Sequence, residues 1–315
     1  MPLRIVFMGT ADLACASLEA LSHGHDFQMV AVVTQPDRPK GRDLKTSSSA
    51  VKALALKLNL PVLQPLKARD EKFVAELRAL APDLIVVVAY GQILPQSILE
   101  IPRLGCLNVH TSLLPKFRGA APIQWALLND ESRTGVTIMK MDAGLDTGDI
   151  LAQVETPISD DDTAATLHDR LATMGAELLL RTIVEWAAGR ITARPQPAAG
   201  ASYAKKISRE DGRIDWSLPA RQIWNQVRAF TPWPGSYTSW QGSGQKRLLK
   251  IRRAVPDKTR SGSAGKILAA DKTGIVVGCG VESLRILDLQ LEGGRILSAA
   301  EFLAGHALGP DDQLV

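Results

Sequence analysis

The first 190 residues alternate short apolar runs of strand length with amphipathic segments of helix length. A strand in a parallel sheet is buried on both faces and reads as a continuous apolar run, whereas a surface helix repeats its apolar positions every three or four residues. The pattern predicts buried strands over 4–9, 29–35 and 83–91 and helices over 49–60 and 71–80. Strands that alternate with helices in this way predict a parallel α/β sheet.

The pattern continues with more strands and one long helix. Residues 105–110 and 135–142 each read as a strand, and 149–158 reads as the hairpin partner of the second. A long helix should begin near Asp161 or Asp162, either of which can act as its N-cap, and should stop at Gly189. Its apolar positions, spaced four and three residues apart, are Leu167, Leu171, Met174 and Leu178.

The composition and the hydrophobic periodicity of the sequence change after Gly189. Residues 190–208 are rich in Pro, Ala and Gly and lack a sustained period, which is typical of a linker. One helix is expected within 213–230, and closely spaced short strands with Gly-rich turns follow it. Many short strands in a small domain predict a β-barrel, OB-like in the simplest case.

The amino-acid composition limits the classes of protein to which this chain can belong. The chain has 315 residues, of which 45% are hydrophobic and 22% charged, as expected of a soluble globular protein with two domains. The three cysteines, Cys15, Cys106 and Cys279, include no CxxC pair, which argues against a disulfide framework and a thiolate metal site. We see neither a signal-peptide pattern nor a membrane-spanning apolar run, so we expect a cytoplasmic protein.

Charge is unevenly distributed along the chain. Residues 205–315 carry 17 Lys and Arg against 11 Asp and Glu, a surplus of six, whereas residues 1–204 carry 20 against 22. A basic C-terminal part suggests a polyanionic partner such as nucleic acid, although a surplus of this size also occurs on ordinary solvated surfaces.

Asn108 and His110 are the first candidates for chemistry. They lie two apart on the predicted strand, so both side chains should point to one face while Val109 packs on the other. An isolated pair of this kind is often a buried histidine bonded to a neighbouring asparagine. The stretch after them, SLLPKFRGAAPIQ, contains a rigid proline, a basic pair and a glycine before a new helix, which favours a ligand loop.

A second candidate is the glycine-rich stretch MDAGLDTGDI, which contains Asp142, Asp146 and Asp149. It lacks the order of an EF-hand loop, so we do not expect it to bind calcium. Such a loop after a strand can instead bring one carboxylate next to a histidine. The turn after Gly9 lacks the GxGxxG and Walker patterns, so we interpret it as a tight strand-to-helix turn.

Several of these motifs together resemble the 10-formyltetrahydrofolate-dependent formyltransferases. The similarity is carried by HTSLLPKFRGAAPIQWAL (110–127) together with GVTIMKMDAGLDTGDI (135–150). Segments 35–46, 89–95, 206–217 and 228–237 narrow it to the bacterial branch that formylates methionyl-tRNA. The resemblance implies a Rossmann-like catalytic domain over 1–189, a linker over 190–208 and an OB-like barrel over 209–315 that helps to hold tRNA.

The resemblance also implies substrates and site residues. The formyl donor would be 10-formyltetrahydrofolate and the acceptor initiator Met-tRNA, with no metal, no membrane and a monomeric chain. The matching catalytic triad is Asn108, His110 and Asp146. The segment that matches a folate contact is Ser112, Leu113, Leu114 and Pro115.

The loop matching residues 36–46 would enter the tRNA acceptor region, with Arg42 as the strongest candidate contact. Without the resemblance, Arg42 reads as a solvated loop arginine. Three departures from the family pattern occur: Thr111 replaces a glycine, Ala11 and Leu13 replace a proline and a phenylalanine, and SSSAVK (47–52) replaces a proline-containing loop exit.

Two alternatives stay open. A formyltransferase of the same fold could act on a small amine, such as a nucleotide or a sugar nucleotide, but it would need neither the arginine loop nor a basic barrel. A non-catalytic folate-sensing or tRNA-binding module would not require Asn108, His110 and Asp146 together.

Overall fold

The structure is a computed structural model that describes residues 1–40, 45–242, 245–310 and 312–315. The chain divides into two compact units. The first comprises Met1–Pro122, Arg133–Pro157 and His168–Ala204, and the second comprises Ile123–Ser132, Ile158–Leu167 and Lys205–Val315. No helix within the described ranges is long and apolar enough to cross a membrane.

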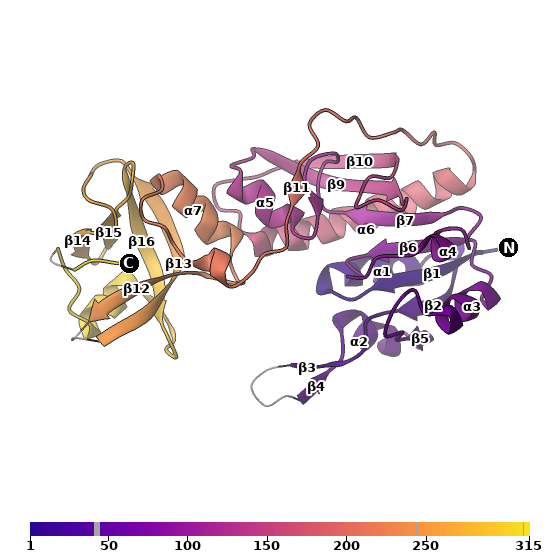
Figure 1. Ribbon diagram of the computed structural model, residues 1–315, viewed down its shortest axis with the longest axis horizontal. Helices are drawn as coiled ribbons and strands as arrows, with labels where there is room; N and C mark the ends of the chain where they lie inside the picture. The colour runs from indigo at the N-terminus through magenta and orange to yellow at the C-terminus, as the bar shows by residue number, and fades with distance from the viewer. Residues whose placement is uncertain (41–44, 243–244, 311) are drawn as a thin grey trace. The chain divides into compact units, whose positions relative to one another are not determined.

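A seven-stranded sheet forms the centre of the first unit (Figure 1). The strand order is β10-β9-β7-β6-β1-β2-β5, in which β7 to β5 run parallel and β9 and β10 are antiparallel to their neighbours. This arrangement confirms the predicted parallel α/β sheet and the hairpin at its edge. The bounds are β1 Leu3–Gly9, β2 Phe27–Val33, β5 Val62–Leu63, β6 Leu84–Val88, β7 Cys106–His110, β9 Arg133–Lys140 and β10 Ile150–Pro157.

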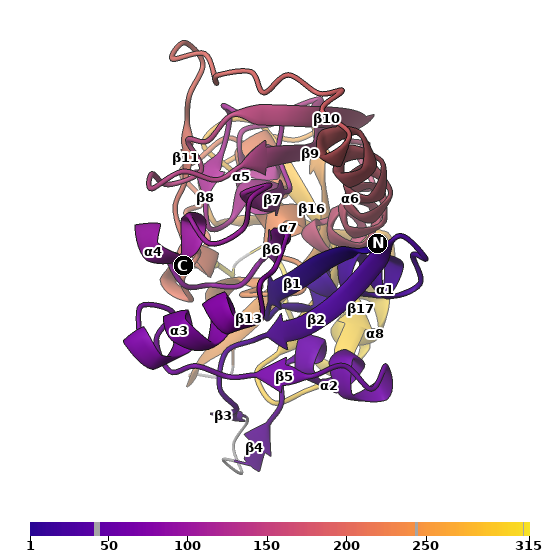
Figure 2. The ribbon, with the colours of Figure 1, turned by 90° about the vertical axis from the view of Figure 1, so that its right-hand side faces the viewer.

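Helices cover both faces of this sheet. Figure 2 shows α3 (Glu71–Ala79) and α4 (Gln96–Leu99) on one face and α1 (Cys15–Ser22) with α6 (Ala164–Ala187) on the other. Asp70 caps α3 by accepting from the Lys72 N–H, and Ser49 caps α2 (Ala50–Lys57) by accepting from the Lys52 N–H. Val51 and Ala55 of α2 and Phe73 and Leu77 of α3 are at most 5% exposed, as expected of the apolar faces of amphipathic helices.

Short elements complete the first unit. A 3₁₀ turn, η1 (Asp12–Ala14), leads from β1 into α1, and β3 (Arg38–Lys40) pairs with β4 (Lys45–Ser47). β8 (Arg118–Gly119) pairs in parallel with β11 (Tyr203–Ala204), which joins two segments that are far apart in the sequence. Residues 190–204 of the predicted linker therefore carry ordered hydrogen bonds to the loop that follows β7.

The second unit is built on an antiparallel sheet of the order β12-β13-β16-β15-β14, with β17 paired to β16. Its core is apolar and includes Trp216, Trp240, Ile251 and Phe302, whose side chains are at most 5% exposed. The elements are η2 Glu210–Gly212, α7 Ala220–Ala229, β12 Ser236–Gly242, β13 Gln245–Asp257, β14 Ile267–Asp271, β15 Gly274–Gly278, β16 Ser283–Leu291, β17 Ile296–Ser298 and α8 Ala299–Gly305.

The last residues of the chain close this sheet. Leu314 pairs with Trp240 at the β12 edge, and Gln313 pairs with Lys266 beside β14. The two open edges are thereby bridged by one strand-like segment, which removes unpaired edges as barrel closure does. The barrel that the short strands predict is confirmed.

Two stretches from the middle of the chain also belong to the second unit. The first contains most of α5 (Pro122–Leu128) and Asp130, whose carboxylate accepts from the Arg221 guanidinium at 2.8–3.1 Å. The second contains Ser159, whose carbonyl accepts from Arg228 at 2.9 Å. Both guanidinium groups lie on the Trp224 ring, at 4.2 and 3.9 Å from its centroid, where cation–π attraction adds to the ion pair.

Candidate active site

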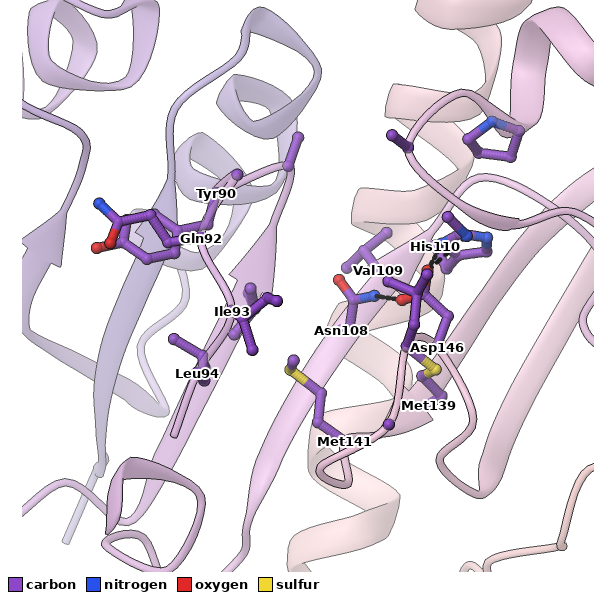
Figure 3. A pocket seen from close by; sticks show the side chains of 18 of the residues that line it. Tyr90, Gln92, Ile93, Leu94, Asn108, Val109, His110, Met139, Met141 and Asp146 are labelled. Carbon is purple, nitrogen blue, oxygen red and sulfur yellow. Dashed lines mark hydrogen bonds and ion pairs between the residues drawn. The ribbon is translucent and has the colours of Figure 1, made fainter. Parts of the chain in front are cut away.

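A cavity of about 480 Å³ opens at the carboxyl ends of β6 and β7. Its walls are formed chiefly by residues 89–94, 108–111 and 141–146. Figure 3 shows Tyr90 to Leu94 on one side of this space and Asn108, His110 and Asp146 on the other. Ligands of open α/β sheets bind at the carboxyl ends of the strands, so the position of the cavity agrees with the fold.

The β7 strand carries Asn108 and His110 into the cavity wall. They are 9% and 6% exposed, and both line the cavity. Val109 between them points to the opposite face, towards α6, where a Cβ on Gly175 would come within 2.9 Å of it. The predicted alternation along the strand is therefore observed, and a glycine on α6 allows the close packing behind it.

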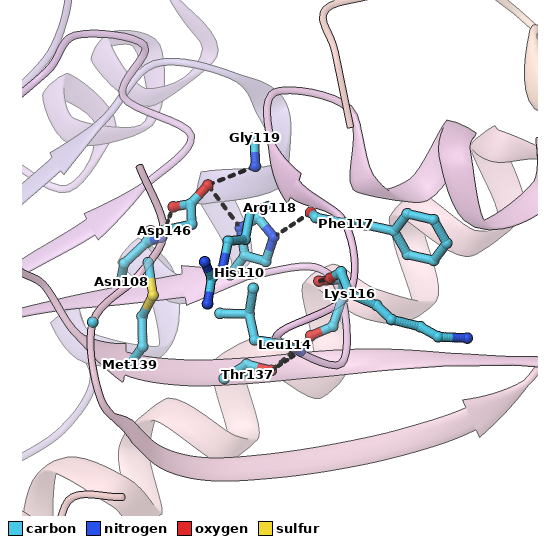
Figure 4. Close-up of polar contacts among 12 residues, drawn as sticks. Asn108, His110, Leu114, Lys116, Phe117, Arg118, Gly119, Thr137, Met139 and Asp146 are labelled. Carbon is cyan, nitrogen blue, oxygen red and sulfur yellow. Dashed lines mark hydrogen bonds and ion pairs between the residues drawn. The ribbon is translucent and has the colours of Figure 1, made fainter. Parts of the chain in front are cut away.

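The loop after β9 brings Asp146 to these two residues. Its Oδ1 accepts from Asn108 Nδ2 at 3.4 Å, and its Oδ2 lies 3.8 Å from His110 Nδ1 (Figure 4). Oδ2 also accepts from the backbone N–H of Gly119 at 2.8 Å, which fixes the carboxylate. The structure thus brings together Asn108, His110 and Asp146, the three residues predicted to be catalytic.

This loop has a constrained backbone. Asp146 has φ +53°, a left-handed conformation that is uncommon for residues other than glycine. At Gly148 a Cβ would lie 1.9 Å from the carbonyl oxygen of Lys140, so no larger residue fits there. The glycines of MDAGLDTGDI therefore allow the loop to turn tightly against the end of β9.

The other nitrogen of His110 is already engaged. Its Nε2 lies 2.9 Å from the carbonyl oxygen of Phe117, and a carbonyl can only accept. Nε2 therefore carries a hydrogen, and in the neutral ring Nδ1 is the nitrogen without one. Nδ1, next to Asp146, is the ring nitrogen that the Phe117 carbonyl does not occupy.

The predicted folate segment lies beside the cavity rather than on its walls. Ser112 is fully buried, and its hydroxyl donates to the carbonyl of Lys116 at 2.6 Å. The N–H of Leu114 donates to the hydroxyl of Thr137 at 3.1 Å. The lining residues of the cavity include none of Ser112, Leu113, Leu114 and Pro115, so their contact with folate stays a prediction.

Four more residues were singled out in the sequence: Arg42, Thr111, Leu13 and Cys106. Arg42 lies outside the described residues. Thr111 and Leu13, two of the departures from the family pattern, both line the cavity. Cys106, at the start of β7, is buried, and burial raises the pKa of its thiol to about 12, so it is a packing residue rather than a nucleophile.

Several cavity residues were not assigned a role from the sequence. Tyr90, Leu94 and Met141 give the cavity apolar surfaces, and Ile93 and Leu145, which also line it, are 85% and 57% exposed. The only sequence signal for them is that they lie in the motifs 89–95 and 135–150. An apolar cavity with a few convergent polar groups is typical of a small-molecule site.

Comparison with known proteins identifies the relatives of this chain. The family described as formyl transferase matches residues 3–183, and the formyl transferase C-terminal domain matches residues 206–307. The methionyl-tRNA formyltransferase of Geobacter sulfurreducens is 52% identical over 312 residues, which cover 99% of this chain and 96% of that protein. That of Pseudomonas putida is 49% identical and covers 98% of this chain and 100% of that protein.

Solved structures share the fold at lower identity. WlaRD, a sugar 3N-formyl transferase crystallised in the presence of dTDP and 5-N-formyl-THF, is 21% identical with a TM-score of 0.65, over 91% of this chain and 97% of that chain. HypX from Aquifex aeolicus in complex with tetrahydrofolic acid is 18% identical with a TM-score of 0.62, over 96% of this chain and 47% of that chain. From the match to residues 3–183 and the full-length relatives at about half identity, it follows that the chain belongs to the formyl transferase family.

Proposed function

We propose that this protein transfers the formyl group of 10-formyltetrahydrofolate to the α-amino group of methionine on initiator tRNA. The observation that carries the choice of acceptor is the similarity to methionyl-tRNA formyltransferases, which extends over nearly the whole chain and both of its family matches. The chemistry is supported by the meeting of Asn108, His110 and Asp146 on the wall of one cavity.

The cavity suits the formyl donor. A folate has a flat ring system with polar edges, and the cavity is lined by the apolar residues Leu94 and Met141 together with polar residues such as Asn108 and Asp142. The formyl carbon would then lie near Asn108 and His110, at the polar side. We keep Ser112 to Pro115 as a proposed folate contact, and hydrogen bonds to Lys116 and Thr137 hold Ser112 and Leu114 in place beside the cavity.

The reaction is acyl transfer from nitrogen to nitrogen. The neutral α-amine attacks the formyl carbon, and the carbonyl oxygen becomes an oxyanion in a tetrahedral intermediate. Asn108 can donate an amide hydrogen to this oxygen, since its bond to Asp146 uses only one of the two. A protonated His110 can donate from Nδ1, which lies 3.8 Å from Asp146 Oδ2.

The same group of residues can take up the proton that the amine releases and supply the proton that the leaving nitrogen needs. The attacking amine must lose one proton, and the folate nitrogen must gain one when its bond to the formyl carbon breaks. Asp146 accepts the first proton, directly or through water, and returns a proton to the leaving nitrogen. The Gly119 N–H holds the carboxylate in place during this exchange at 2.8 Å.

For tRNA, the proposal rests on charge and on the arginine loop. The surplus of six positive charges over 205–315 supplies sequence-independent attraction to phosphates. Arg42→Leu should raise the KM for Met-tRNA by about tenfold, the equivalent of about 1.4 kcal/mol, without changing folate affinity. Steady-state kinetics with each substrate varied in turn would test this, and unchanged tRNA kinetics would remove Arg42 from the proposal.

The proposed function is tested by supplying 10-formyltetrahydrofolate with either charged initiator tRNA or free methionine and measuring formyl-methionine. We expect product with Met-tRNA alone. If no product forms on Met-tRNA while the folate still binds, the acceptor is a small amine, such as a nucleotide or sugar nucleotide, and the choice of acceptor is wrong.

A further inference from the structure

One stretch of the first unit, residues 194–204, touches both loops that form the polar side of the cavity. Arg194 pairs with Ile150 through two backbone hydrogen bonds of 2.8 and 3.0 Å. Further along, Tyr203 and Ala204 pair with Arg118 and Gly119 in β8. We refer to residues 194–204 as the clasp.

Gln196 makes the contacts of the clasp with the Asp146 loop. Its Nε2 donates to the carbonyl oxygens of Asp146 and Gly148, each at 2.8 Å. Its Oε1 accepts from Arg118 Nε at 3.0 Å and from Arg118 Nη2 at 2.8 Å. Both amide hydrogens and the amide oxygen are therefore used, and one side chain joins the Asp146 loop to the segment before Gly119.

The second half of the clasp holds the segment that faces His110 and Asp146. Ser202 Oγ accepts from the Phe117 N–H at 3.0 Å, and the Ser202 carbonyl accepts from the Arg118 N–H at 2.8 Å. The carbonyl of Phe117 accepts from His110, and the N–H of Gly119 donates to Asp146. The clasp thus fixes the backbone groups that orient two of the three proposed catalytic residues.

We propose that Gln196 is a positioning residue for Asp146. Gln196 holds the Asp146 loop against the Arg118–Gly119 segment, and the Asp146 carboxylate therefore faces Asn108 and His110. The expected loss of kcat rests on the proposed function, whereas the hydrogen bonds that position Asp146 do not depend on it. Asp146 has φ +53°, and such a conformation persists only where surrounding contacts hold it. Gln196 bonds to the carbonyl of Asp146 itself, so it acts at that strained residue.

Two substitutions of Gln196 separate its contacts. Gln196→Met keeps the length of the side chain and removes all four hydrogen bonds. Gln196→Glu keeps an acceptor for Arg118 but places a carboxylate against two carbonyl oxygens, which repel it. Because a displacement of about 1 Å in a catalytic group can cost about a hundredfold in rate, we expect both variants to lower kcat by about tenfold to a hundredfold with little change in the KM for either substrate.

A matched control is Gln28→Glu on β2. Gln28 Oε1 also accepts from an arginine, Arg4, at 3.4 Å, but the residue is exposed and does not line the cavity. We expect its kcat to stay within about twofold of that of the wild type, since distant and independent sites do not couple.

The decisive kinetic comparison uses the Asp146→Asn background. If Gln196 acts through Asp146, Gln196→Met should change kcat by less than about twofold once the carboxylate is gone, because the two residues serve one interaction. An equal fractional loss of kcat in both backgrounds would show a general structural role and would overturn the proposal.

Hydrogen–deuterium exchange of the substrate-free protein gives a readout that does not depend on activity. Gln196→Met should increase exchange in peptides that cover 142–149, and Gln28→Glu should leave them unchanged. Unchanged exchange in Gln196→Met would contradict the proposal. If the wild type formylates no Met-tRNA, the proposed function fails, while the exchange result still decides whether Gln196 holds the Asp146 loop.

Discussion

Strands β6 and β7 lie side by side in the first unit and differ in one respect. Both are five residues long and buried throughout, and they pair in parallel with Val87 opposite Asn108. Every residue of β6 is aliphatic, whereas β7 places Asn108 and His110 on the face that lines the cavity. The backbone geometry is the same, so the difference lies in what each strand presents at its carboxyl end.

The apolar residues of β6 contribute to stability, whereas we propose that the polar residues of β7 contribute to the reaction. A buried apolar strand stabilises the fold by removing apolar surface from water, while a buried amide or imidazole needs partners to offset its lost hydration. Asn108 and His110 have those partners in Asp146 and Phe117. The polar residues of β7 are thus accommodated in the core at little net gain in stability, as expected of residues retained for a reaction.

The largest effect should come from removing His110. His110→Ala deletes one proposed donor to the oxyanion, and the loss of one such donor costs about 3 to 4 kcal/mol, or about a hundredfold to a thousandfold in kcat. The control is His168→Ala on α6, which removes an imidazole beside an aspartate, Asp169, outside the cavity. Formylation kinetics that are near native in purified, folded His110→Ala would exclude the residue from the mechanism.

The corresponding change in β6 should affect stability rather than rate. Val86 is fully buried and does not line the cavity. Val86→Ala should lower the apparent free energy of unfolding by about 2 kcal/mol, because two methyl groups leave a packed core. Urea unfolding measures this loss, and kcat should stay within about twofold of the wild type. A large fall in kcat with unchanged stability would reverse the roles assigned to the two strands.

The smallest effect concerns Asp83, which immediately precedes β6. Its carboxylate accepts from the Arg4 N–H at 2.9 Å and from Arg103 at 2.7 Å, and these bonds hold its pKa below the ordinary value. A lowered pKa in the folded state contributes stability above the ordinary aspartate value of about 3.9 and loses it as the pH falls through the folded value.

Asp83→Asn should therefore lower stability at pH 7 by less than about 1 kcal/mol, the usual range for a partly exposed pair. The difference from the wild type should shrink as the pH falls below about 4. Urea unfolding at several pH values measures it. A difference that grows towards low pH would contradict the assignment of the effect to the charged carboxylate.

Much of the first unit could be predicted from the sequence because its information is local. The apolar run of β6 and the two-residue alternation of β7 fix which faces are buried, and the pair Asn108 and His110 follows from that alternation. Asp146 lies 38 positions after Asn108 and 36 after His110, so resemblance to a family, and not spacing, predicts that the three residues meet.

The rest depends on contacts that no local pattern encodes. Gln196 lies in a stretch rich in proline and alanine, where hydrogen bonds to residues nearly 50 positions earlier leave no period in the sequence. The pairing of Leu314 and Gln313 with two separate strands of the second unit is equally non-local. The folate contact of Ser112 and Leu114 rests on a family motif, and it stays a prediction.

The central claim is that β7 presents catalytic polar groups on a strand that is otherwise built like β6. The most direct test is to measure kcat and thermal unfolding of Asn108→Leu, which gives β7 an apolar residue of similar size, beside Asn129→Leu at an exposed position. We predict that kcat of Asn108→Leu falls by about a hundredfold or more, as for a lost oxyanion donor, while its melting temperature is not lowered. A variant that retains kcat within about tenfold, or that loses activity only because it unfolds, would contradict the account.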